Sequence, residues 1–209
     1  TKYNCLPGDC ITATNFFPSA GCPDGDGDAT TTCNGNGNGY VDSQTAGAGG
    51  TTATRREHLK FWQHLALAGL IEGQYTGVGG SGDSIIHVVI GTNAPNTPIS
   101  GLGITINHLL PVSTTWDSAL GVDWGTGRHI LMIGGESSNT STGMGKLTVL
   151  QARGLDVKVD DGLANNGWFR VRDAIAFWNT LGSTTGTAPN YSYGTNQSAL
   201  CSIRILKNW

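Results

Sequence analysis

The chain has 209 residues, 12 of them Lys or Arg and 15 Asp or Glu, which gives a formal net charge of -3. This length suits one domain with a substantial hydrophobic core, and basic residues this sparse argue against binding to nucleic acid or to an anionic membrane. Charged residues make up 13% of the sequence, about half of the roughly 25% usual in soluble domains, so Thr, Ser, Asn and Gly must cover a weakly charged surface that suits packing beside copies of the same chain.

The first 54 residues predict a loop-rich region that disulfides stabilise. Turn residues are frequent there, as at Pro7-Gly8-Asp9. The region also holds four of the five cysteines, which are Cys5, Cys10, Cys22 and Cys33, with Cys201 far away in the sequence. This pattern favours disulfides formed in an oxidising compartment. Zinc is a weaker alternative, because the sequence has no CxxC spacing and no histidine beside the cysteines. Which cysteines pair, and which one is left over, stays open.

Residues 22–45 carry oxygen-bearing side chains at every second position, separated mainly by glycine and other small residues. Glycine lets the backbone curl so that alternate side chains converge on one point, and about six to eight oxygen ligands are what calcium binds. The candidate calcium ligands are the alternating residues, the carbonyl of one tyrosine and a glutamate of the following helix: Asp24, Asp26, Asp28, Asn34, Asn36, Asn38, Tyr40, Asp42 and Glu57.

The second half of this segment follows the EF-hand spacing, with Gly39 at the sharp turn. Thr45, however, stands where the bidentate glutamate of an EF-hand belongs, so carboxylates from elsewhere are required. The alternative is a solvated loop of turn-forming residues without an ion.

Residues 55–72 predict an amphipathic helix. Apolar residues recur at helical spacing and form one face that belongs in the core; they include Leu59, Trp62 and Leu65. Gly73 is predicted to end the helix. His58 and His64 lie six positions apart and do not share a face, so we expect surface or boundary histidines.

Residues 84–209 predict mainly β-structure with one short helix near residues 147–155. Apolar runs separated by Gly, Pro, Asn and Thr turns predict strands at 84–90, 103–110, 128–133, 168–171 and 202–206. One clear helix followed by several antiparallel strands is an α+β domain. Asp160-Asp161-Gly162 indicates a tight turn or a second contact to a cation, because adjacent side chains project in different directions and make a poor acid–base pair.

Recognisable catalytic motifs are absent from the sequence. It contains no GxSxG, no P-loop and no signature of a catalytic cysteine. We therefore expect no enzymatic activity. A secreted hydrolase that uses a cation is the weakest alternative, because no nucleophile or base can be placed.

Three parts of the sequence together resemble the prepilin-type proteins of bacteria, which are the type IV pilins and the type II secretion pseudopilins. They are TKYNCLPGDCITATNFF at residues 1–17, the polar loop that leads into FWQHLALAGLIEGQYTG at residues 61–77, and LDVKVDDGLANNGWFRV at residues 155–171 followed by CSIRIL at residues 201–206. Their order and spacing match the family, whereas residues 84–150 carry nothing diagnostic.

The resemblance implies that residues 1–209 form one pilin-like globular head domain, with an amphipathic helix, an antiparallel sheet and long loops. It implies a structural subunit of an extracellular or periplasmic bacterial filament, whose partners are copies of itself and other pilin-like subunits in a helical array. It also implies an apolar helix and a processing site ahead of Thr1, absent from these 209 residues, which would anchor the protein in the inner membrane before assembly. Several pseudopilins hold calcium in a loop of the head domain, and by analogy Glu57 would tie such a loop to the helix.

An extracellular calcium-dependent adhesin or a carbohydrate-binding module is the alternative function. Six tryptophans and many Asn and Thr residues suit contacts to sugars. Four of the tryptophans lie in or beside polar loops, namely Trp116, Trp124, Trp168 and Trp209. The competing interpretation is that they are core or subunit-interface residues.

Overall fold

The structure is a computed structural model that describes residues 3–17, 34–41, 57–79, 88–109, 128–136, 145–164, 166–173 and 200–206. Within these residues the helices are α1 (Ala13–Phe16), α2 (Glu57–Leu67) and α4 (Val149–Val159), and the strands are β1 (Gly103–Leu109), β2 (Arg128–Gly134), β3 (Leu147–Thr148), β4 (Phe169–Asp173) and β5 (Leu200–Ile205). Helices and a sheet therefore combine in an α+β fold, as predicted.

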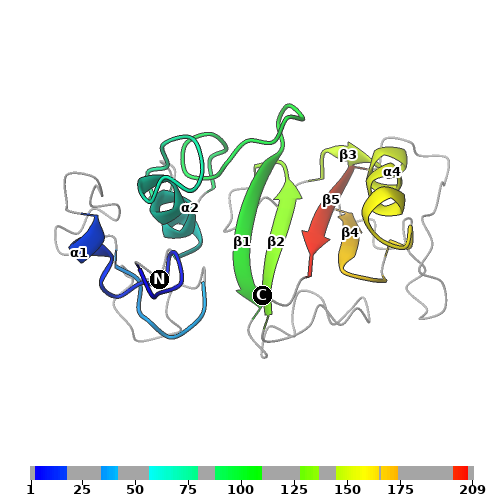
Figure 1. Ribbon diagram of the computed structural model, residues 1–209. Helices are drawn as coiled ribbons and strands as arrows, with labels where there is room; N and C mark the ends of the chain where they lie inside the picture. The colour runs from blue at the N-terminus through cyan, green and yellow to red at the C-terminus, as the bar shows by residue number, and fades with distance from the viewer. Residues whose placement is uncertain are drawn as a thin grey trace, which may run out of the picture.

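All strand pairs of the described sheet are antiparallel. The strand order is β1-β2-β5-β3, and β4 also pairs with β5. β1 and β2 pair over their full length, from Gly103 opposite Gly134 to Leu109 opposite Arg128. Figure 1 shows β5 between β2 and β4, so the last strand of the chain joins the two parts of the sheet.

Both longer helices pack on the same face of the sheet. Successive side chains of a strand point to opposite faces. In β2, Leu131 packs with the cluster around Leu59 and Trp62 of α2 (the α2 cluster), while Ile133 packs with the cluster around Val149 and Ala152 of α4 (the α4 cluster). Ile130 and Met132 point the other way and form a separate buried cluster with Leu206. In Figure 1, α2 lies near β1 at one end of the sheet and α4 lies near β4 at the other.

Helix α2 presents Leu59 and Trp62 to the core, as its apolar periodicity predicts. It ends at Leu67, earlier than expected, because Gly69 adopts a left-handed conformation with φ of 69°. The Gly69 amide then donates to the Ala66 carbonyl and the Leu70 amide to the Leu65 carbonyl, both at 2.9 Å. This is a Schellman ending, so the prediction that Gly73 ends the helix is wrong.

The predicted surface position of the α2 histidines is also wrong. His58 is 0% exposed and His64 is 3% exposed. Apolar periodicity identifies only the face of α2 that meets the sheet. The N-terminal loop covers the helix from another side, where the Gly8 amide donates to Nδ1 of His64. Helix α2 is therefore buried by two separate parts of the chain.

Helix α4 begins with a reciprocal capping box. Thr148 Oγ1 accepts a hydrogen bond from the Gln151 amide, and Gln151 Oε1 accepts one from the Thr148 amide. Ala152 points into a core cluster with residues of β3, β4 and β5; its buried members are Leu102, Leu147, Val149, Ala152, Ala164, Phe169, Val171, Cys201 and Ile203. The helix predicted near residues 147–155 is confirmed, although it begins after β3 and runs to Val159.

Four of the five predicted strands are found within about two residues of their expected bounds, as β1, β2, β4 and β5. The strand predicted at 84–90 lies largely outside the described residues, and its last residue, Ile90, makes only an isolated bridge to Ala94. The region 1–54 was expected to be irregular, but it contains the one-turn helix α1. Residues 174–199 lie outside the described part of the chain.

Candidate functional site

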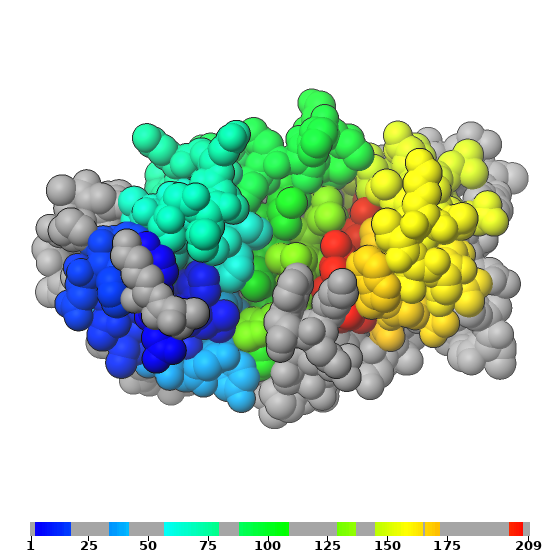
Figure 2. Space-filling model, viewed as in Figure 1, coloured from blue at the N-terminus to red at the C-terminus, as the bar shows by residue number. Residues whose placement is uncertain are grey.

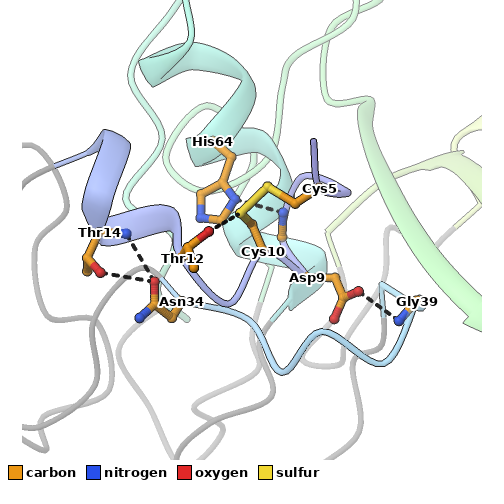
Figure 3. Close-up of a disulfide and its surroundings, with 9 residues drawn as sticks. Cys5, Asp9, Cys10, Thr12, Thr14, Asn34, Gly39 and His64 are labelled. Atoms are coloured by element: carbon orange, nitrogen blue, oxygen red, sulfur yellow. Dashed lines mark hydrogen bonds between the residues drawn. A yellow bond between two sulfur atoms is a disulfide. The ribbon is translucent and has the colours of Figure 1, made fainter. Parts of the chain in front are cut away.

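A disulfide between Cys5 and Cys10 closes a short loop against helix α2. The two Cα atoms are 5.2 Å apart, and the Asp9 amide donates to the Leu6 carbonyl at 3.2 Å to form the turn. Gly8, with φ of 83°, donates its amide to His64 Nδ1 at 2.9 Å (Figure 3). The structure therefore assigns one pairing that the sequence left open.

Of the other three cysteines, the structure describes Cys201. Cys201 is a buried residue of β5 and packs in the α4 cluster. Cys22 and Cys33 lie outside the described residues. The N-terminal region thus contains the Cys5–Cys10 bridge, and its stabilisation by disulfides stays a prediction.

The carboxylate of Asp9 accepts hydrogen bonds from the Asn- and Gly-rich segment, residues 34–41. Its Oδ1 accepts a hydrogen bond from the Asn38 amide at 3.0 Å, and its Oδ2 accepts one from the Gly39 amide at 2.8 Å. The Asp9 carbonyl accepts a third from the Gly37 amide at 3.0 Å. Asp9 is only 4% exposed, and backbone amides satisfy both of its carboxylate oxygens. Residues 34–41, the Asn/Gly segment, are therefore bound to the disulfide loop.

Close packing accompanies these hydrogen bonds. The Gly35 amide donates to the Cys10 carbonyl at 2.9 Å, and a Cβ atom at Gly35 would overlap the backbone of Gly8 and Asp9. A glycine is required at this position because two backbones meet there. Figure 2 shows the Asn/Gly segment between the N-terminal residues and the green strand region of the molecule.

The asparagine side chains of this segment accept hydrogen bonds from backbone amides. Asn34 Oδ1 accepts from the Thr14 amide at 3.0 Å. Asn36 Oδ1 accepts from the Asn38 amide at 2.9 Å, and Asn38 Oδ1 accepts from the Tyr40 amide at 2.8 Å. The last two bonds are Asx turns. The every-second-residue spacing that suggests calcium ligands thus also gives this stretch its local turns.

The first turn of α2 contributes one anion and one cation to the same segment. Glu57, 0% exposed, accepts a hydrogen bond at Oε1 from the Asn36 amide at 2.9 Å. Lys60, 8% exposed, donates from Nζ to the Asn34 carbonyl at 2.8 Å. The structure therefore brings Glu57 to the segment to which the sequence assigned it.

Two histidines hold the far end of the Asn/Gly segment on the sheet. The Val41 amide donates to His129 Nε2 at 2.9 Å, and the His108 amide donates to the Val41 carbonyl at 3.0 Å. His108 and His129 are direct cross-strand partners in β1 and β2, and the Tyr40 ring stacks on His108 with centroids 4.1 Å apart. The sequence did not predict a role for His108 and His129, because the Asn/Gly segment that they bind is far away along the chain.

The environment of His129 lowers its pKa below the ordinary value of 6.5. Burial is the main cause and the neighbouring His108 adds to it, while Asp9 acts in the opposite direction. A neutral imidazole is what the geometry requires, because Nε2 must keep a lone pair to accept the Val41 amide.

The described part of the calcium segment has the right donor chemistry for a hard cation. Amide, carbonyl and carboxylate oxygens are what calcium prefers; among the predicted ligands, Asn34, Asn36, Asn38, Tyr40 and Glu57 are described. Glu57 supplies their single carboxylate. The other predicted carboxylates, Asp24, Asp26, Asp28 and Asp42, lie outside the described residues. Asp9 is a nearby carboxylate that sequence reasoning missed; the turn motif around it was the available signal.

A second acidic group surrounds the turn after α4. Ligand atoms of Asp156, Asp160 and Asp161 lie within 4.8 Å of one another. Asp160 Oδ2, however, accepts from the amides of Trp168 and Phe169 at 2.7 and 2.8 Å. Asp156 and Asp161 accept hydrogen bonds from the amides of Gly162 and Leu163 and from the side chain of Asn166. The sequence Asp160-Asp161-Gly162 suggested either a tight turn or a contact to a cation, and the structure shows the tight turn.

Among the tryptophans considered for sugar binding, Trp168 is described and is half-buried against the α4 cluster. Trp116, Trp124 and Trp209 lie outside the described residues. No helix in the described ranges is both long enough and apolar enough to cross a bilayer. No protein-family model, curated protein or solved structure matches the chain.

Proposed function

We propose that the chain is a pilin-like head domain of a structural subunit, in a bacterial type IV pilus or type II secretion pseudopilus. The observation that carries this proposal is that the segments that resemble prepilin-type proteins pack against one another in two pairs. Residues 1–17 contribute the loop that contacts α2 through His64. Residues 155–171 run from α4 into β4, which pairs with β5 in the segment 201–206.

Calcium is the ion we propose for the loop-rich side of this head. Its ligands would come from Asp24, Asp26, Asp28, Asn34, Asn36, Asn38, Tyr40, Asp42 and Glu57. The support is the position of the described members: the Asn/Gly segment and Glu57 are hydrogen-bonded to each other. Bound calcium would neutralise carboxylates that repel one another and so order residues that cannot bury a core of their own.

A filament role also assigns partners and location. The partners are copies of the same chain and related subunits, outside the cytoplasm. The weakly charged surface supports such packing, because charged residues are only 13% of the sequence and like-charged neighbours would repel each other little. A disulfide in the described region fits an oxidising compartment.

Immunogold electron microscopy of surface filaments tests the proposal, with antibodies raised against residues 1–209. The comparison uses cells that carry the gene, cells in which it is deleted and cells in which it is restored. Labelled filaments that are lost on deletion and recovered on complementation would support the role. The proposal fails if filaments are unlabelled and unaffected by deletion while the gene encodes no apolar helix ahead of Thr1.

A further inference from the structure

The Cys5–Cys10 loop is the point where three segments of the chain meet. On one side its Gly8 amide binds His64 of α2. On the other side Asp9 and Cys10 accept hydrogen bonds from four amides of the Asn/Gly segment, those of Gly35, Gly37, Asn38 and Gly39. The loop itself is only four residues between its cysteines, so the disulfide restricts the position of every acceptor in it.

We propose that the Cys5–Cys10 disulfide is a redox-controlled latch whose reduction releases the Asn/Gly segment from the disulfide loop. Four backbone amides lose pre-positioned acceptors when the loop opens, because all four acceptors belong to Asp9 or Cys10. The other hydrogen bonds of the segment do not involve the loop: they come from Thr14, Glu57, Lys60, His108 and His129, and the Asn38 amide also donates to Asn36 within the segment. Reduction therefore loosens the four amides of Gly35, Gly37, Asn38 and Gly39, while Asn34, Asn36 and Val41 keep contacts outside the loop.

The two cysteines of the bond differ in exposure. Cys5 is an exposed residue, whereas Cys10 is 3% exposed. A thiolate of a dithiol reductant attacks Sγ of Cys5, the S–S bond breaks, and Cys10 leaves as a thiolate that takes up a proton. The second thiol of the reductant then displaces Cys5 from the mixed disulfide. Two electrons and two protons pass to the cysteines, and the dithiol becomes a cyclic disulfide.

Opening of the disulfide loop has a local effect, because the α4 cluster is built from other residues. The α4 cluster contains no residue from the disulfide loop or the Asn/Gly segment. Helix α4, β4 and β5 therefore keep their packing when the loop opens. Hydrogen exchange in α4 can therefore serve as an internal reference within the same molecule.

Hydrogen–deuterium exchange on the full chain tests the latch, comparing a peptide over residues 34–41 with one over residues 149–159. A dithiol reductant is expected to speed exchange at residues 35–39 by about tenfold or more, with 149–159 unchanged and with protection restored on reoxidation. The variant Cys22→Ser/Cys33→Ser isolates the effect from those two cysteines. The double variant Cys5→Ser/Cys10→Ser should show the fast exchange without reductant.

Two outcomes overturn the proposal. One is unchanged exchange over 34–41 after mass spectrometry has shown that Cys5 and Cys10 are reduced. The other is equal acceleration over 149–159, which means that the whole domain has unfolded. If the double-serine variant does not fold, reduction of the folded wild-type chain still decides between these results.

Discussion

At the scale of single residues, the buried carboxylate of Asp9 links the disulfide loop to the Asn/Gly segment. It is 4% exposed and accepts the amides of Asn38 and Gly39. Asp9→Ala removes the acceptor of the Gly39 amide and leaves the Asn38 amide with Asn36 Oδ1 alone, and should lower the free energy of unfolding by about 2 kcal/mol. Asp9→Asn keeps one oxygen acceptor and should lose about half as much. Urea denaturation measures both changes.

Asp161→Ala is the matched control for this prediction. Asp161 is also an acceptor for a backbone amide, that of Leu163, but it is exposed. Water can replace the lost acceptor there, so we expect a loss below about 1 kcal/mol. Equal losses for Asp9→Ala and Asp161→Ala would show that burial of the Asp9 carboxylate has no energetic importance.

His129 should make stability depend on pH. The unfolded imidazole has a pKa near 6.5, and burial beside His108 lowers the pKa in the folded chain. Between these two values the unfolded chain binds more protons, so acid favours unfolding. The contribution of His129 is complete above about pH 6.5 and is lost as the pH falls through the lowered value. Urea midpoints measured from about pH 7.5 down to about pH 5 should decrease.

The variant His129→Gln separates this contribution from that of the other titrating groups. Its amide oxygen can still accept the Val41 amide, but it has no proton to gain in this range. We expect a shallower decrease of the urea midpoint than in the wild type. Parallel pH profiles for the two proteins would contradict the assignment to His129.

At the scale of elements, the capping box decides how well α4 begins. Thr148→Ala removes the side-chain acceptor of the Gln151 amide, and such a loss costs about 1 kcal/mol. Thr148→Ser keeps the hydroxyl and should be nearly neutral, although it removes the methyl group of the last residue of β3. Thermal unfolding of the three proteins measures the difference. Equal losses for the serine and alanine variants would mean that packing of the methyl group, which both variants lack, and not capping, stabilises the start of α4.

The elements themselves could largely be predicted from local patterns. Apolar runs bounded by turn residues predict β1 and β2 because strand pairing buries those runs, and helical spacing predicts α2 through Leu59 and Trp62. The end of α2 could not be predicted with the same security, since Gly69 and Gly73 are both plausible endings by sequence. Burial of His64 depends on Gly8, 56 residues away, and no local pattern reports such a contact.

The candidate site was predicted only in part, for a similar reason. Alternating oxygens identify the segment, and Glu57 at the start of α2 does meet it. The alternating spacing does not predict that Asp9 accepts hydrogen bonds from the Asn38 and Gly39 amides, or that His129 accepts one from the Val41 amide. These partners come from other elements, and only the folded arrangement brings them together.

At the scale of the whole molecule, the described residues form two halves with different means of stabilisation. The α4 half has a continuous apolar cluster, whereas the disulfide loop and the Asn/Gly segment are held by hydrogen bonds, one disulfide and small clusters such as that of Cys10, Ala13 and Phe17. An ion that binds only the folded chain would therefore contribute most to the loop-rich half.

Calcium removal should weaken that half selectively. If calcium is present at about 100 times its dissociation constant, binding contributes about 2.7 kcal/mol, which corresponds to about 5 to 10 °C in Tm for a chain of this size. Excess chelator should lower Tm by that amount and make residues 22–45 sensitive to protease before the α4 half. Added calcium should reverse both effects, and Glu57→Gln should require more calcium to do so because it removes a carboxylate. Melting and proteolysis that are identical with and without chelator would mean that hydrogen bonds and the disulfide alone order this half, and that the calcium site does not exist.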